Sequence, residues 1–181
     1  AIMAKTIYAA LTGNNGGLKL APLYSDGMVM QRRQPIVFRG MVNAGTQVKV
    51  AFNGQQQTCT AAANGHWKAI FPAMEAGGPY EAQIRTKGER RDLHLIYIGE
   101  VWLCSGQSNM EFPVKATTTA TEDLAHADQH PLLHLYNMPT RFPTNAEKWP
   151  KAVLDSVNRL ALLDTKGWQV ASKAATAYFS A

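Results

Sequence analysis

The chain has few of the features that crosslink a protein or anchor it in a membrane. Its 181 residues include only two cysteines, Cys59 and Cys104, which are too few for a disulfide framework. We expect two free thiols, with Cys104 at the end of a buried strand behaving as a small apolar side chain. The sequence has no run of 18 apolar residues, so it predicts no membrane span.

Charged residues are also sparse, at 17% of the chain, and the formal net charge is +5. The basic residues form no stripe, because the only adjacent pairs are at 32–33 and 90–91 and aromatic residues do not alternate with them. Nucleic-acid-binding modules cluster their positive charge, so we expect no nucleic-acid partner. A basic surface would instead favour the approach of a small anionic ligand.

The histidines show no metal-binding pattern. His66 is expected beside a turn and His94 within a strand, and neither has a partner at metal-ligand spacing. His130 and His134 flank Pro131, and exposed or hydrogen-bonded side chains are the simpler interpretation of both. The sequence therefore predicts neither a metal nor a cofactor.

The first half of the chain contains a series of short segments in which apolar and polar residues alternate. Such alternation indicates strands with one buried face, and Asn53-Gly54 is typical of the tight turn of a hairpin. Short strands separated by turn signals predict a small β-sandwich over residues 18–95, preceded by an extension at 1–17. The expected strands cover 36–38, 47–52, 55–61, 67–71, 80–85 and 92–98, with turns at 64–65, 76–79 and 87–89.

A different pattern occupies residues 95–109. Two apolar runs, 95–98 and 101–104, end abruptly at the sequence SGQSN of residues 105–109. Apolar runs bounded by turn residues are typical of buried strands, so we expect Trp102 to pack in a core. Functional side chains often lie on the loop where such a strand ends. The loop at 105–109 is therefore the candidate site.

Ser108 in this loop has the layout of an activated nucleophile. Gly106 would permit a sharp turn and leave room for a substrate to approach backbone N–H groups, which would stabilise an oxyanion. Gln107 belongs to the same loop, and Asn109 is expected to brace it by hydrogen bonding. Glu111 is either a substrate contact or a carboxylate that caps the following turn. The block differs from the Gly-x-Ser-x-Gly elbow, because methionine occupies the place of the second glycine.

The sequence GEVWLCSGQSNME at 99–111 resembles the nucleophile block of the sialate O-acetylesterase family, within the SGNH hydrolases. LYSDGMVMQR at 23–32 and AGGPY at 76–80 resemble the N-terminal signatures of that family in the same order. LLHLY at 132–136 and GWQ at 167–169 resemble it more loosely. The resemblance implies an α/β protein in which the β-sandwich is followed by a hydrolase domain of the SGNH type. That domain would have a flavodoxin-like three-layer α/β fold. Residues 96–181 would be its first part, so it is incomplete in this chain.

The resemblance makes Ser108 the nucleophile and its own backbone N–H an oxyanion donor. The second-block glycine, the third-block asparagine and the Asp-x-x-His block of the family would lie beyond Ala181. A serine needs a base within hydrogen-bond reach, so we expect the chain alone to be nearly inactive. The histidine and aspartate would lie either on a second polypeptide formed by processing or on a remainder of the protein that has been deleted.

The implied substrate is an O-acetylated sialic acid, and the implied location is periplasmic or secreted. Two alternatives stay open. One is an acetylxylan-type esterase acting on neutral sugars, because the same nucleophile block serves them. The other is a non-catalytic carbohydrate-binding β-sandwich.

The second half of the chain offers one internal alternative for the base. Asp123 and His126 have the Asp-x-x-His spacing, but they follow Ser108 closely on an expected short helix over 121–129 that Thr121 would cap. A solvated helix face is the simpler interpretation. Further helices are expected over 153–163, from its apolar spacing, and from 174 onward.

Overall fold

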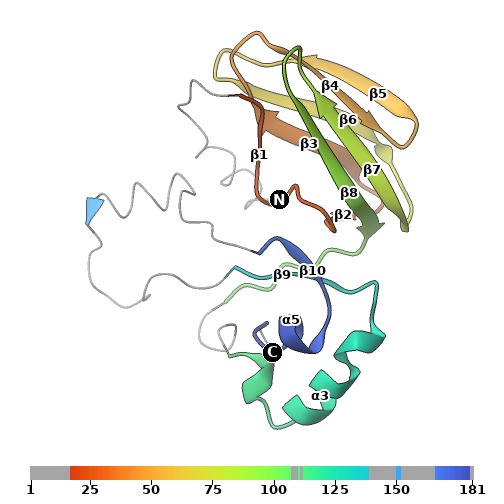
Figure 1. Cartoon of the computed structure of the whole chain (residues 1–181), viewed down its shortest axis with the longest axis vertical. Helices are drawn as coiled ribbons and strands as arrows, with labels where there is room; N and C mark the ends of the chain where they lie inside the picture. Colours follow the sequence, from red (N-terminus) through yellow and green to blue (C-terminus); the bar gives the residue numbers. More distant parts are fainter. Residues whose placement is uncertain (1–16, 107–109, 111, 139–149, 152–165, 180–181) are drawn as a thin grey trace.

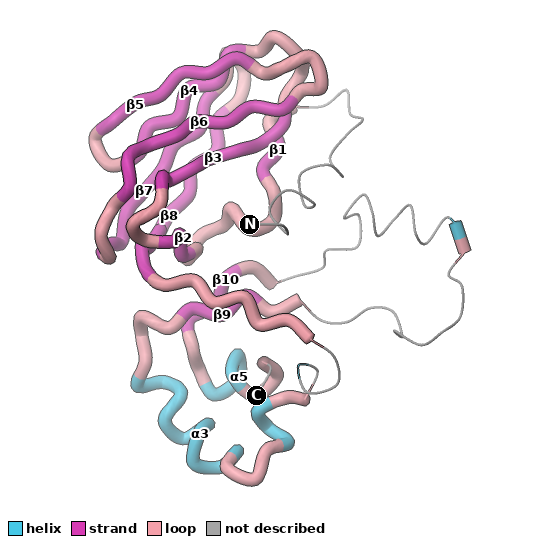
Figure 2. The backbone as a smooth tube through the Cα atoms, turned by 180° about the vertical axis from the view of Figure 1, so that it is seen from behind, coloured by secondary structure: helices cyan, strands magenta, loops and turns pink. Residues whose placement is uncertain are grey.

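A computed structural model of the protein describes residues 17–106, 110, 112–138, 150–151 and 166–179 (Figure 1). Its regular secondary structure is mostly β-sheet, and helices are few. The strands β1 to β8 lie at one end of the molecule and the helices at the other, with β9 and β10 between them (Figures 1 and 2). The boundaries expected at residues 17 and 95 stay a prediction.

The first eight strands are β1 (Lys19–Leu20), β2 (Val29–Gln31), β3 (Pro35–Met41), β4 (Gln47–Phe52), β5 (Gln55–Thr60), β6 (His66–Ala73), β7 (Gly77–Arg85) and β8 (Arg90–Gly99). They form a three-stranded sheet of order β1-β3-β6 and a five-stranded sheet of order β2-β8-β7-β4-β5. β2 pairs with β8 in parallel, and the other pairs are antiparallel. Both sheets contribute side chains to one shared core.

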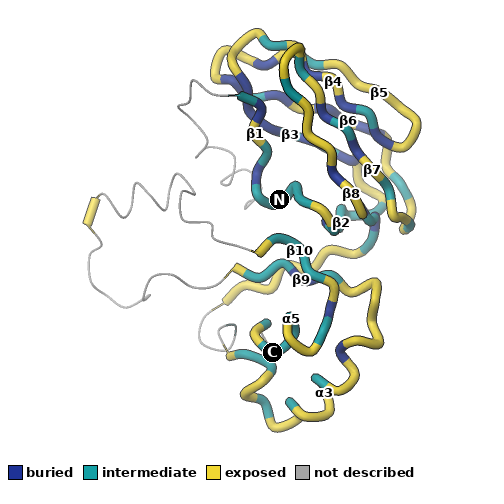
Figure 3. The backbone as a smooth tube through the Cα atoms, viewed as in Figure 1, coloured by how far each residue is buried: buried dark blue, intermediate teal, exposed yellow. Residues whose placement is uncertain are grey.

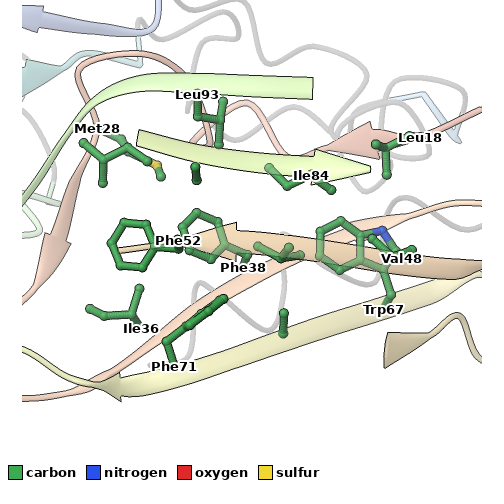
Figure 4. Packing of buried hydrophobic residues seen from close by; sticks show 14 of the residues in the cluster. Leu18, Met28, Ile36, Phe38, Val48, Phe52, Trp67, Phe71, Ile84 and Leu93 are labelled. Atoms are coloured by element: carbon green, nitrogen blue, oxygen red, sulfur yellow. The ribbon is translucent and has the colours of Figure 1, made fainter. Parts of the chain in front are cut away.

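Aromatic side chains from both sheets meet in this core. The ring centroid of Phe38 on β3 lies 5.2 Å from that of Phe52 on β4 and 5.8 Å from that of Phe71 on β6 (Figure 4). Edge-to-face contacts at such distances add to the free energy gained by burial. Alternate residues of β4 and β6 are buried, as their pattern predicts. Asn53 and Gly54 have φ of 46° and 71°, so the expected tight hairpin turn is confirmed.

Two strands differ from the expectation. β7 begins at Gly77, within the expected turn at 76–79, and the run at 95–98 is only partly buried. Ile96 and Ile98 are buried, whereas Leu95 is 53% exposed and has a φ of 54°. The register explains the difference, because two residues of β8 oppose the single residue Glu81 between the pairs Tyr80–Ile96 and Ala82–Leu93. This β-bulge turns Leu95 outward, which alternation alone does not predict.

The remaining elements are η1 (Val114–Ala116), α3 (Ala120–His126), η2 (Ala127–Gln129), β9 (His134–Tyr136), β10 (Trp168–Val170) and α5 (Lys173–Thr176). The expected cap at Thr121 is wrong, because α3 begins one residue earlier and Thr119 occupies the N-cap. The Thr119 hydroxyl lies 2.7 Å from a carboxylate oxygen of Asp123, to which it donates. The helix expected from residue 174 is the single turn of α5, which Ser172 caps by accepting from the Ala175 N–H at 3.1 Å.

Residues 21–28 connect β1 to β2 and attach β9 and β10 to the sheets. The indole Nε1 of Trp168 donates to the carbonyl of Leu23 at 2.9 Å, and Nδ1 of His134 lies 2.5 Å from the carbonyl of Gly27. Gly27 has a φ of 79°, which disfavours any side chain there. We call residues 21–28 with His134 and Trp168 the junction.

Several expectations remain open or limited at this stage. The extension at 1–17, apart from its last residue, and the helix expected at 153–163 lie outside the described residues. Within the described residues, no helix is long and apolar enough to cross a membrane.

Tyr24 in the junction gives a prediction at alkaline pH. Its hydroxyl donates to the Val37 carbonyl at 2.8 Å, and burial raises its pKa to about 12. The pKa in the folded state is therefore above the usual value of 10. The neutral phenol thus contributes its full stability below pH 10, and this contribution is lost as the pH rises toward 12.

Replacing Tyr24 with Phe should lower the free energy of unfolding at neutral pH by about 1 kcal/mol, the typical net value of one hydrogen bond. The difference from wild type should shrink above pH 10, and urea unfolding at several pH values measures it. Tyr178→Phe, at a residue that is 64% exposed, is the matched control. An unchanged difference across this pH range would contradict the role given to Tyr24.

Candidate functional site

The centre of the candidate site is not among the described residues. Ser108, Gln107, Asn109 and Glu111 all lie outside them, so their roles stay predictions. The structure does describe Gly106 before this stretch, Met110 within it, and the segments on both sides. The site is therefore built here from the elements that lead into the loop and out of it.

The segment leading into the loop was expected to be a buried strand, and this is wrong for residues 101–104. They form no strand and are exposed (Figure 3). Trp102, expected in the core, is 85% exposed, and Leu103 is 70% exposed. Cys104 is also exposed rather than buried, although both thiols are free as expected. A continuous apolar run is buried only where cover exists on both faces, and the described residues supply none here.

The absence of a side chain at Gly106 leaves room for the side chain of Met110. A Cβ atom at this position would lie 2.5 Å from Cγ of Met110, a distance that real Cβ contacts do not show. Its φ is not in the left-handed region, so close contact explains the glycine better than unusual backbone geometry does. Gly106 and Met110 therefore touch across the four positions that separate them.

A polar clamp holds the start of this segment. The Glu100 carboxylate accepts from Nε2 of Gln31 at 3.0 Å and from Nε of Arg32 at 2.5 Å. The amide oxygen of Gln31 in turn accepts from the Val101 N–H at 3.0 Å. Hydrogen bonds from Gln31 and Arg32 hold the pKa of Glu100 below its usual value. We call Gln31, Arg32 and Glu100 the exit clamp, because it fixes the direction in which the chain leaves β8.

The residues after the loop pack against the C-terminal part of the chain. The Val114 N–H donates to the Phe179 carbonyl at 3.0 Å, and the Lys115 N–H donates to the Ala177 carbonyl at 3.1 Å. The Lys115 ammonium also lies 3.8 Å from the ring centroid of Tyr178, a distance typical of a cation–π contact. Segments about 60 residues apart in sequence therefore meet beside the candidate site.

The structure does not bring Asp123 and His126 together as a catalytic pair. Both are exposed on α3, and they have different partners. Asp123 accepts from Thr119, whereas Nδ1 of His126 lies 2.9 Å from the Glu122 carbonyl. These contacts agree with a solvated helix face.

The other histidines have structural surroundings. His94 lies 3.2 Å from the Glu81 carboxylate and His134 belongs to the junction, whereas His130 is exposed. Across the described ranges, no three histidine, cysteine or acidic side chains are grouped so that they could hold a metal ion.

Sequence reasoning missed the junction, although its residues were already marked. Leu23 and Gly27 lie in the LYSDGMVMQR segment, His134 lies in LLHLY, and Trp168 lies in GWQ. These three segments carried the upstream and downstream parts of the resemblance. Their meeting in space means that they share one structural task, the attachment of β9 and β10 to the sheets.

Comparison with known proteins finds similarity to proteins named as esterases. No family model matches the chain. A solved carbohydrate acetylesterase from Xanthomonas citri is 28% identical and superposes with a TM-score of 0.73, over 90% of this chain and 34% of that one. The described fold is therefore shared with part of a carbohydrate acetylesterase.

The curated relatives carry a more specific name. The human protein named sialate O-acetylesterase is 30% identical over 121 residues, which are 61% of this chain and 23% of that protein. The protein of the same name from Pongo abelii is 27% identical over 143 residues, 73% of this chain and 27% of that protein. The chain is thus a distant homologue of these proteins and spans about a quarter of their length.

The exposure of the segment at 101–104 predicts a difference between the two thiols. Cys104 is exposed, whereas Cys59 is partly buried and burial raises its pKa, so Cys59 has less of the reactive thiolate. A maleimide at neutral pH should label Cys104 at least about tenfold faster than Cys59. The variants Cys59→Ser and Cys104→Ser assign each rate. Slow labelling of Cys104 would contradict the exposed segment.

The exit clamp predicts local protection of one amide. Glu100→Ala should leave Gln31 without its anchor and make the Val101 N–H exchange with solvent several-fold faster, while the melting temperature changes little because the pair is exposed. Glu75→Ala, which removes the exposed ion pair with Arg33, is the control. In wild type the protection should persist at neutral pH and fall only below the usual carboxyl pKa, because a lowered pKa keeps Glu100 ionised. Equal exchange in both variants would refute the clamp.

Proposed function

We propose that this chain is the nucleophile-bearing portion of an SGNH-type carbohydrate esterase that removes O-acetyl groups from sugars. The observation that carries the proposal is the similarity to a carbohydrate acetylesterase over 90% of the chain, with a TM-score of 0.73. The sequence block at 99–111 adds a serine in the layout of a nucleophile. The proposal assigns the start of the hydrolase domain to residues 96–181.

In the proposed reaction, the Ser108 hydroxyl attacks the acetyl carbonyl carbon while a base takes its proton. The backbone N–H of Ser108 stabilises the oxyanion that forms. The sugar oxygen then leaves with a proton, which gives an acetyl-enzyme that water hydrolyses to acetate. Gln107 and Asn109 brace the loop in this scheme. Glu111 either contacts the substrate or caps the next turn.

We propose that the histidine and aspartate are carried by a second polypeptide. The chain spans 23–28% of its curated relatives, which leaves most of a related protein unaccounted for. The exposed apolar side chains of Val101, Trp102 and Leu103 support this proposal, because a continuous apolar run is typical of a strand inside a covered sheet. We propose that the second polypeptide supplies that cover.

The relatives' names favour an O-acetylated sialic acid as the substrate. We also propose a periplasmic or secreted location, which is what the sequence resemblance implies. An acetylxylan-type esterase is the alternative within the same chemistry. A non-catalytic carbohydrate-binding module is the alternative outside it. The two sheets support the last alternative, because their shared core is formed by residues of this chain alone.

The test uses the native preparation with every polypeptide that it contains. A fluorophosphonate should label this chain, and Ser108→Ala should abolish labelling and lower acetate release by about 10³-fold or more, as loss of a serine nucleophile does. Ser105→Ala is the matched control, because it removes a neighbouring exposed hydroxyl. Acetate release from 9-O-acetyl sialic acid and from acetylated xylan separates the two substrates.

Two outcomes would overturn parts of the proposal. Labelling and acetate release that survive in Ser108→Ala would remove the nucleophile assignment. A denaturing gel that shows only this chain, in a preparation without esterase activity, would favour the binding module.

A further inference from the structure

The outward face of the five-stranded sheet holds a hollow, lined by both apolar and polar residues, that the proposed reaction does not use. Its volume is about 310 Å³, and it lies beside the β4–β5 hairpin turn. We call it the β7–β8 groove. Its polar lining comes from Asn53, Glu81, Gln83, Arg90, Asp92 and His94.

The sheet register explains why the face is hollow at this place. Ala51 on β4 pairs with Gln83 on β7, which pairs with Asp92 on β8. Cross-strand partners share a face, so a methyl group stands in a row with two longer polar side chains. The hairpin turn at 53–54 lies beyond Ala51 and closes one end of the hollow.

The β-bulge on β8 shapes the other end. His94 and Leu95 together oppose Glu81, and His94 Nδ1 lies 3.2 Å from the Glu81 carboxylate. Bulges re-aim side chains and are common beside functional sites. Here the bulge adds an imidazole and a carboxylate to the groove.

The remaining polar side chains hold one another in place. The Asp92 carboxylate accepts from Nε2 of Gln83 at 3.0 Å and from Nε of Arg90 at 2.7 Å and 2.8 Å. The hydrogen bonds from Arg90 and Gln83 keep the pKa of Asp92 low. Preorganised polar groups lose little entropy when a ligand binds. The groove therefore resembles a prepared hydrogen-bonding surface.

The charges of the groove select against ions. Two carboxylates, Glu81 and Asp92, stand beside one guanidinium and one imidazole, so an ion of either sign would meet a like charge. Hydroxyl groups both donate and accept, so a neutral polyol suits carboxylates, guanidinium and amides together. Phe52 lines the groove but is only 2% exposed, so its ring is not available for a ligand to stack on.

We propose that the β7–β8 groove binds neutral sugar residues of a glycan chain. The proposal rests on the proposed function for its glycan substrate and adds a second hold on the polymer, away from the serine loop. It also favours neutral glycans over free sialic acid at this groove, because Glu81 and Asp92 oppose a sugar carboxylate.

The test titrates the ¹⁵N-labelled full chain with xylohexaose, cellohexaose and chitohexaose, and separately with N-acetylneuraminic acid. At least one neutral oligosaccharide should shift the amide signals of the groove residues on β7 and β8, and the acid should not. Gln83→Ala should weaken this binding at least about tenfold, since it removes one wall of the groove and one of the hydrogen bonds that hold Asp92. Thr58→Ala, on the exposed β5 strand outside the groove lining, should leave it unchanged.

The amide spectrum of each variant shows whether the sheet is intact. If Gln83→Ala disturbs it, Glu81→Gln replaces it, keeps the size of the side chain and should weaken binding in the same direction. Groove signals that respond to none of the three neutral sugars, that respond more to the acid, or that are unaffected by both variants would overturn the proposal. Ser108→Ala must bind like wild type, so failure of the esterase assignment and failure of the groove give different results.

Discussion

The positive φ of Gly27 is the constraint on which the arrangement of the described chain depends. At this residue the backbone turns so that its carbonyl meets His134. A Cβ atom would lie at an ordinary contact distance of 3.6 Å from Trp168 and His134, so the φ of 79°, and not a lack of space, disfavours a side chain. The Leu23 carbonyl, four residues earlier, accepts from the Trp168 indole. Trp168 also packs against the core of the two sheets. The position of β9 and β10 therefore follows from a few backbone carbonyls and the absence of one side chain.

The exit clamp and the junction have related effects on the candidate site. Gln31 and Arg32 belong to the end of β2 and the residue after it, and β2 itself begins just after Gly27. The same short stretch of chain thus attaches β9 and β10 on one side and directs the segment at 100–106 on the other. The segment that leads into the candidate loop is therefore held by residues far from it in sequence.

The sequence predicted the parts of the fold that depend on neighbours along the chain. The alternation over 47–52 and the Asn53-Gly54 turn have local causes, and both appear as expected. The expectation that Trp102 is buried was wrong, because burial of an apolar run depends on neighbouring strands that lie elsewhere in the sequence. The bulge at Leu95 was missed for a similar reason, since register is a property of two strands together. The segments that form the junction could be recognised in the sequence only through the resemblance. Nothing in the sequence indicated that they contact one another.

The bulge on β8 is hydrogen-bonded to the junction. The His94 N–H donates to the Asp26 carboxylate at 2.8 Å, and the His94 carbonyl accepts from the Gly27 N–H at 3.1 Å. Residues 26 and 27 thus satisfy both backbone groups that the extra residue removes from the ladder with β7. His94 lines the β7–β8 groove, whereas Gly27 holds His134. Because one pair of adjacent residues bonds both the bulge and β9, a movement of this loop would change the groove and the attachment of β9 together.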